Sequence, residues 1–360
     1  MGAKVVEFSQ FAGLQAPTPR KNLIINFGPL FNTMICQTTI RTSLAILLTI
    51  LITGCSDEIQ MIKAGDPLPV VFAVFDASDN EHFIKLTKTF ASDANAWELT
   101  SDPKNLFYSD VELFLTELPG NRRNHFSVVE GIPREPGLLP RLPNQAYRYE
   151  GSLHQGNYRM TVNIPDQPEI TADFRLLDGF TIITPRPGTK RFYLYDDPIL
   201  FSWYRHPEAG LFEISLIISY EEVTKDGASS LKSARYNRQL KPDNLEVDPI
   251  KNSYLFYSDP FYAYLGGQIA RDPQVDYRKP VRFDMEITAA DTTLARYLNW
   301  FALEIDDKIN PNGNVNGAIG VVASKCTVVY PDLILSQRAQ DSLVRGHYTQ
   351  DLGFVANSDW

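Results

Sequence analysis

The sequence predicts a mainly β protein: an immunoglobulin-like antiparallel β-sandwich followed by a second β-rich, sandwich-like domain with short helical insertions. Three observations predict this class. Apolar and polar residues alternate with a period of two over many short segments, turn residues separate these segments, and aromatic residues make up 12% of the chain. No pattern of helical period interrupts residues 69–178, whereas two such patterns occur later.

The first predicted domain, residues 67–178, is a succession of strands. Its clearest strand covers residues 157–164, where Tyr158, Met160, Val162 and Ile164 alternate with polar residues. These four side chains are expected to face a second sheet, because successive residues of a strand point to opposite faces. The other strands are expected at residues 69–75, 82–90, 109–117, 125–129, 147–149 and 170–174.

The second predicted domain, residues 179–360, follows a linker near Gly179 and combines strands with helices. Strands are expected at residues 199–203, 211–220 and 281–288. One helix is expected after Asp259, which would serve as an N-cap before a proline in the first turn. A second helix is expected over residues 291–301, where four apolar residues share one helical face.

An apolar run precedes the first domain. Its core, Leu44 to Ile52, is shorter than the roughly 20 residues that a membrane-spanning helix needs. The run ends in Ile-Thr-Gly-Cys at residues 52–55 and resembles the lipobox of a bacterial lipoprotein signal peptide. This resemblance implies cleavage behind Gly54 and acylation of Cys55, for example with palmitate. The mature chain would then be anchored to a membrane by lipid.

A start at Met34 gives this signal peptide the usual order of segments. Residues 1–33 are then interpreted as a misassigned upstream extension, residues 34–54 as the signal peptide and residues 55–66 as a polar tether. Translation from Met1, with a very long first segment of the signal, is the alternative. Both starts yield the same mature protein.

Composition limits the partners of the mature chain. Loss of residues 1–54 removes four basic side chains and one acidic one, so the formal net charge changes from −9 to −12. An acidic chain of this kind is a poor binder of nucleic acid. Cys326 would be the only unmodified cysteine, which excludes a disulfide within the mature chain, and we expect it to be a small buried residue of a strand.

Several segments together resemble an uncharacterised family of Bacteroidota outer-membrane lipoproteins, a domain of unknown function related to immunoglobulin-like and fibronectin-like modules. The matching segments are the lipobox at Cys55 and residues 70–75, 83–88, 156–162 and 314–322. The last segment departs from the family pattern, because Ala318 and Ile319 stand where the family has an aromatic residue beside glycines. The resemblance implies a lipoprotein anchored to the outer membrane, on its periplasmic or cell-surface face, that works beside a TonB-dependent transporter. It supplies no catalytic residues.

No motif points to a metal, a cofactor or a catalytic centre. The Asn-rich loop at residues 306–317 resembles the opening of a calcium loop, but Ala323 stands where a closing Glu is needed. We therefore expect a structural turn there, since Asn and Gly tolerate turn geometry. G-x-S-x-G and H-E-x-x-H are both missing from the sequence. The carboxylate pairs at residues 196–197 and 221–222 are adjacent in strands and should point to opposite faces.

The sequence therefore favours a non-enzymatic lipoprotein that binds or assembles with an envelope protein. Aromatic residues gather at positions 203–204, 254–257, 261–264 and 300–301, and Tyr257 and Tyr262 are the expected binding residues on the surface. The alternative is a cell-envelope glycan-binding protein or glycan hydrolase. Carboxylates and aromatic rings converging in one cleft would support that alternative.

Overall fold

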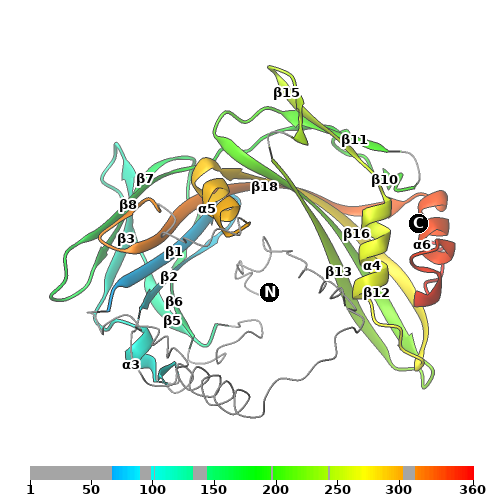
Figure 1. Ribbon diagram of the computed structural model, residues 1–360, viewed down its shortest axis with the longest axis horizontal. Helices are drawn as coiled ribbons and strands as arrows, with labels where there is room; N and C mark the ends of the chain where they lie inside the picture. Colours follow the sequence, from blue (N-terminus) through cyan, green and yellow to red (C-terminus); the bar gives the residue numbers. More distant parts are fainter. Residues whose placement is uncertain are drawn as a thin grey trace, which may run out of the picture.

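A computed structural model describes residues 67–89, 99–100, 102–132, 144–195, 198–241, 244–302 and 313–360. The described part confirms the predicted class: most of it is β-strand in packed sheets, with a few short helices (Figure 1). No helix within these ranges is long and apolar enough to cross a bilayer. The signal peptide, Cys55, the tether and residues 306–312 of the Asn-rich loop lie outside them.

The elements follow one another with short connections. The first half of the chain contains β1 (Pro69–Asp76), β2 (Glu81–Lys88), α3 (Pro103–Leu106), β3 (Glu112–Leu118), β4 (Arg123–His125), β5 (Ser127–Glu130), β6 (Gln145–Glu150), β7 (Gly156–Asn163), β8 (Ile170–Leu176), β9 (Ile182–Thr184) and β10 (Arg191–Phe192). The second half contains β11 (Ile199–Tyr204), β12 (Ala209–Thr224), β13 (Ser229–Leu240), β14 (Glu246–Val247), β15 (Lys251–Phe256), α4 (Asp259–Gln268), β16 (Val275–Asp291), α5 (Thr292–Ala302), β17 (Val315–Asn316), β18 (Ile319–Leu335), α6 (Gln337–Arg345) and the 3₁₀ turn η3 (Gln350–Leu352).

The first sandwich packs two sheets face to face. One contains the first part of β18 and then β1, β2, β6 and β5, and the other has the order β17-β8-β7-β3-β4. The predicted faces of β7 are confirmed, because Tyr158, Met160, Val162 and Ile164 are all buried in the core between the sheets. The alternation of β7 thus determines which of its side chains reach the core.

The second sandwich is built on four long strands in the order β13-β12-β16-β18. One face of this sheet is covered by the β14-β15-β11-β9 sheet and by α4 and α6 (Figure 1). Phe212, Ile214, Leu216 and Ile218 of β12 point into that core, where Trp203 of β11 is fully buried. The opposite face of β12 carries Glu213 and Ser215.

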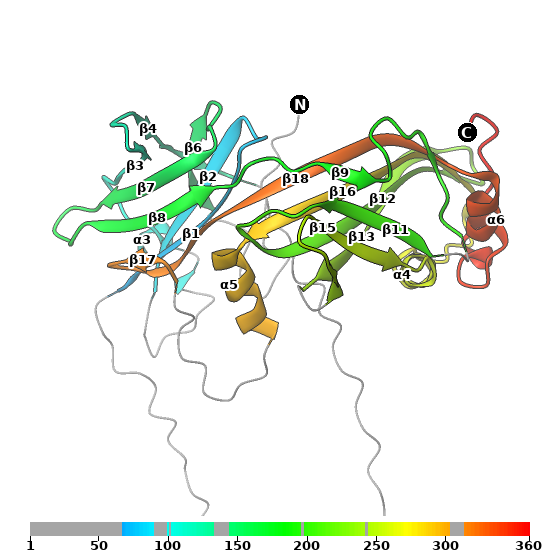
Figure 2. The same ribbon diagram turned by 90° about the horizontal axis from the view of Figure 1, so that it is seen from above.

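Strand β18 belongs to both sandwiches (Figure 2). Its first part pairs in parallel with β1, from Val70 opposite Ile319 to Asp76 opposite Lys325, and Val322 lies in the first core. Its second part pairs with β16 in the second sandwich. Residues 67–178 therefore do not contain every strand of the first sandwich, because β18 pairs with β1 and β17 pairs with β8. The division of the chain into domains at Gly179 stays a prediction.

The two predicted helices are present as α4 and α5. Helix α4 begins at Asp259, and the preceding Ser258 occupies the N-cap position without a capping bond, so Asp259 is not the N-cap that the sequence predicted. The Ser258 hydroxyl instead donates to the Tyr195 carbonyl oxygen at 2.7 Å. At the start of α5, the Asp291 carboxylate accepts from the backbone N–H groups of Leu294 and Ser324, each at 2.7 Å. Asp291 thereby ties α5 to β18 where the two sandwiches meet.

Candidate functional site

The edge of β18 that faces away from β16 is paired only at its two ends. Along this edge, β1 pairs with β18 up to Lys325, and β10 pairs with it from Ile334 onward (Figure 1). Between them, within the described part of the chain, residues 326–333 have no strand partner on this side. Alternate residues of such a strand direct their N–H and C=O groups outward.

A connecting segment, residues 177–190, runs beside this edge without pairing along it. It contacts β18 near both ends: Leu177 N–H donates to Ser324 Oγ at 3.0 Å, and Ile334 N–H donates to the Lys190 carbonyl oxygen at 2.6 Å. Between these points the Tyr330 hydroxyl donates to the Pro185 carbonyl oxygen at 3.3 Å. The strand within the segment, β9, pairs with β11 instead. The segment therefore contacts the middle of the edge through the Tyr330 side chain but does not pair with the backbone there.

A cavity of about 340 Å³ separates the segment from β18, and we call it the edge groove. Its volume falls in the range of small ligand pockets. The lining residues on the connecting segment are Phe180, Thr181, Ile182, Pro187, Gly188, Thr189 and Lys190, and those on β18 are Val328, Val329, Tyr330 and Pro331. The groove therefore combines apolar side chains with backbone groups, and Val329 is 47% exposed.

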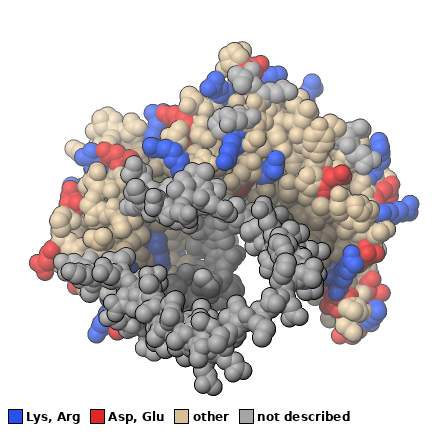
Figure 3. Space-filling model, viewed as in Figure 1, with Lys and Arg blue, Asp and Glu red and all other residues tan. Residues whose placement is uncertain are grey.

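The rim of the edge groove is basic. Residues 179–195 include Arg186, Lys190 and Arg191, all exposed, and no acidic residue. On the β18 side, Arg282 lies 2.7 Å from the Asp284 carboxylate and 3.4 Å from the Asp332 carboxylate, so these three side chains together carry a net negative charge. Figure 3 shows several Lys and Arg side chains across the upper middle of one face of the molecule, although the chain as a whole is acidic. The basic side chains of the connecting segment make that side of the groove suited to an anionic partner.

A second polar cluster lies on the face of β12 opposite the second core. Glu213 is only 5% exposed, and its Oε2 has no hydrogen-bond partner. Burial raises its pKa to about 7, although the charges of Arg235 and Lys325 lower it. The nearby Glu286 carboxylate is held by both terminal nitrogens of Arg235, at 2.8 and 3.1 Å. Glu213 can hold a proton near neutral pH, but its burial keeps the carboxyl out of reach of a substrate.

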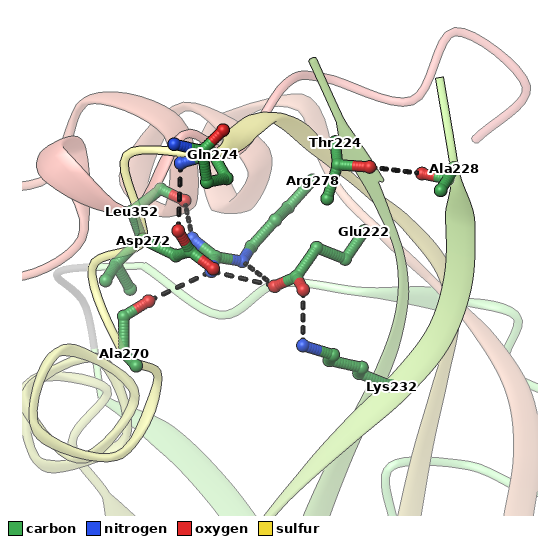
Figure 4. Close-up of polar contacts among 9 residues, drawn as sticks. All are labelled: Glu222, Thr224, Ala228, Lys232, Ala270, Asp272, Gln274, Arg278 and Leu352. Atoms are coloured by element: carbon green, nitrogen blue, oxygen red, sulfur yellow. Dashed lines mark hydrogen bonds and ion pairs between the residues drawn. The ribbon is translucent and has the colours of Figure 1, made fainter. Parts of the chain in front are cut away.

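The third cluster joins the C-terminal region to the long sheet (Figure 4). Arg278 of β16 donates to the Glu222 carboxylate at 2.8 Å, to the Ala270 carbonyl oxygen at 2.9 Å and to the Leu352 carbonyl oxygen. Burial alone would raise the pKa of Glu222, but hydrogen bonds from Lys232 and Arg278 outweigh it and lower the pKa. The neighbouring Glu221 lies on the other face and accepts from Ser229 Oγ, so the expected split of this carboxylate pair is confirmed. These contacts of Arg278 and Glu222 therefore have a structural role: they hold the C-terminal region against the long sheet.

The two predicted binding tyrosines differ in exposure. Tyr257 is 57% exposed, as expected of a surface residue. Tyr262 is only 4% exposed, which corrects its prediction as a surface residue. Its hydroxyl lies 2.6 Å from the Leu194 carbonyl oxygen and 3.0 Å from that of Ala339, because α4 is enclosed by the sheet on one side and α6 on the other. The structure does not bring Tyr257 and Tyr262 into a shared site.

Other sequence predictions fall on structural residues. Asn314 exchanges two hydrogen bonds with the backbone of Val322 and donates to the Asp173 carbonyl oxygen. Its amide therefore links β8 and β18. Within the described ranges, His, Cys, Asp and Glu side chains form no group of three that could hold a metal. Cys326 is buried as predicted, and burial raises the pKa of its thiol to about 11. Residues 196–197 lie outside the described part of the chain.

Sequence reasoning did not find the edge groove. Pro185 and Pro187 did indicate an extended segment, and its three basic residues are visible in the sequence. The partner of that segment is a strand about 140 residues later in the chain. Only long-range pairing places the two side by side.

Comparison with known proteins adds no relative. No known family matches the chain, and no curated protein is similar to it in sequence. Among solved structures, three N-terminal domains of the Hoc capsid protein of bacteriophage RB49 align with a TM-score of 0.17 and 8% identity, covering 72% of this chain and 69% of that one. The adhesin InvE of Yersinia pseudotuberculosis aligns with a TM-score of 0.15 and 9% identity, covering 61% of this chain and 55% of that one. TM-scores this low support no inference about the fold or the function of this chain.

Proposed function

We propose that this chain is a lipid-anchored lipoprotein of the cell envelope, held on the outer membrane through Cys55, with a non-enzymatic binding role. Its partner would be an envelope protein such as a TonB-dependent transporter. The observation that carries the binding role is the edge groove, where unpaired backbone of β18 lies beside apolar side chains and a basic rim. The lipobox-like sequence before the first sandwich supports the anchor.

The polar clusters favour binding over catalysis because the fold itself uses them. Glu222 and Arg278 join the C-terminal turn to the sheet. Glu213 is buried on the sheet, and Glu286 is engaged by Arg235. None of these carboxylates lines the edge groove. A hydrolase would need an acid and a base that both reach the substrate.

A glycan-binding protein is the alternative function. The edge groove supports it less well, because Lys190 is the only charged residue among its lining residues. Phe180 and Tyr330 supply aromatic surface, but the rest of the lining consists of small and aliphatic residues. Sugar sites combine aromatic stacking with several polar side chains that fix orientation. A backbone edge in the groove suits a polypeptide better.

Membrane fractionation tests the anchor. Wild-type protein should remain with membranes through a carbonate wash, because the several acyl chains implied for Cys55 would give stable attachment. The Cys55→Ser variant should appear in the soluble fraction, whereas Cys326→Ser, the matched control, should stay with the membranes. Retention of Cys55→Ser on washed membranes would refute the anchor.

Co-purification tests the binding role. The wild-type lipoprotein is solubilised in mild detergent, and the proteins that accompany it are identified by mass spectrometry. We expect an envelope protein at a constant molar ratio. A purified lipoprotein that carries no protein, but that cleaves or retains cell-wall glycan, would favour the alternative function.

A further inference from the structure

We propose that the edge groove binds a short, extended acidic segment of a partner protein, which adds to β18 as a strand between β1 and β10. This inference rests on the proposed binding function and names the chemistry of the partner. Its starting point is the interrupted row of strands beside β18. The two ends of this row are occupied, and the middle is open to the edge groove.

The unpaired edge supplies the hydrogen bonds for such a segment. Residues 326–333 span roughly 26 Å at about 3.3 Å per residue, and half of them direct their backbone groups outward. The backbone of Asp332 is already engaged, since its N–H donates to Asp284 Oδ1 at 2.8 Å. The available part therefore covers residues 326–331, of which Pro331 can only accept because it has no backbone N–H. It is long enough for a short strand of ordinary pairing geometry.

The volume of the edge groove determines how much of the segment it encloses. One residue of a strand occupies on the order of 160 Å³. This volume is the product of about 4.8 Å between strands, about 10 Å between sheets and about 3.3 Å along the chain. The cavity of 340 Å³ thus holds about two residues. The flanking residues of the partner would lie over the rim, where Arg186, Lys190 and Arg191 are exposed.

The side chains that line the groove select the sequence of the segment. Val328 and Tyr330 are partly buried beside the second core, and Val329 points to the opposite, exposed side. A paired strand would alternate in the same way. Apolar side chains of the partner should therefore lie beside Val328 and Tyr330, while its acidic side chains lie on the exposed side, near the basic rim. The preferred pattern is an alternation of β-branched and acidic residues.

Another open edge of the long sheet is less suitable. The outer strand β13 has an exposed first half, and it carries Lys232, Arg235 and Arg238 along its length. Charged side chains on an edge strand discourage pairing with another chain. The edge groove instead presents Val329 beside unpaired backbone. Docking by strand pairing is thus expected at β18 rather than at β13.

The probe is a fluorescent, end-capped heptapeptide in which Val and Glu alternate, and binding to the full-length solubilised protein is measured by anisotropy. One control peptide has Lys in place of Glu, and another carries N-methyl groups that remove its backbone N–H donors. Both should bind at least about tenfold more weakly, a loss of about 1.4 kcal/mol. Lys190→Glu should weaken binding of the Glu peptide by a similar factor. Lys225→Glu, in the distant turn between β12 and β13, should change it by less than about twofold.

Hydrogen exchange locates the bound peptide. Amide protection should increase in residues 326–330 and remain unchanged in β13. Equal binding of the N-methylated peptide, or displacement of the probe by polygalacturonate without any change in exchange at β18, would overturn strand pairing. Peptide binding by a protein that fails the fractionation test would refute only the anchor. A lipoprotein that co-purifies with a partner but shows no protection at β18 would refute only this inference.

Discussion

The buried carboxyl of Glu213 should make the stability of the second sandwich depend on pH. Burial raises its pKa from 4.5 to about 7, so the folded state binds the proton more tightly than the unfolded state does. The resulting stabilisation is fully present below pH 4.5 and is lost as the pH rises through about 7. This difference between the pKa values of the folded and unfolded states corresponds to roughly 3 kcal/mol in the free energy of unfolding.

Substitution of Glu213 by Gln tests this magnitude. The amide keeps the shape of the side chain and cannot ionise, so the variant avoids the cost of a buried charge. At about pH 8 the Glu213→Gln variant should be more stable than wild type by about 3 kcal/mol, and the two should converge towards about pH 4. Urea unfolding followed by tryptophan fluorescence measures the difference, because Trp203 is fully buried in the second core.

Glu169→Gln is the matched control, since Glu169 is exposed. Its pH profile should match that of wild type. Equal stability of wild type and Glu213→Gln at both pH values would show that the carboxylate is accommodated without cost. The argument from burial would then be refuted.

Three further predictions concern the fold. Arg278→Ala should lower the free energy of unfolding by about 3 kcal/mol in urea titrations, because it removes a buried partner of Glu222, whereas Arg271→Ala, at an exposed ion pair, should cost less than about 1 kcal/mol. Gly320→Ala should reduce the yield of folded protein and its melting temperature, because φ is +135° and a Cβ atom would lie 1.8 Å from a carbonyl oxygen of β1; a melting temperature equal to that of wild type would contradict this. Cys326 should react with maleimide only after denaturation, because its thiol is buried and its pKa is raised to about 11; rapid labelling of the native protein would show that the site opens.

The sequence by itself determined the class of fold and the faces of individual strands and helices. In β7 the alternation of apolar and polar residues predicted which side chains enter the core, and all four are buried. In α5 the spacing of apolar residues placed Leu294 on the packed face. These predictions succeed because side-chain direction repeats every two residues in a strand and about every 3.6 in a helix, whatever the rest of the chain does.

The tertiary structure alone decided which elements became neighbours. Glu213 is polar and lies opposite apolar residues of β12, so its position suggests exposure, yet the surrounding side chains bury it. Tyr262, which was predicted to lie on the surface, is a core residue because α6 covers its side of α4. The edge groove exists because β18 pairs with β1 and also with β16. Such contacts depend on the free energy of the whole folded chain. The local periodicity of the sequence contains no information about which distant segments will pair.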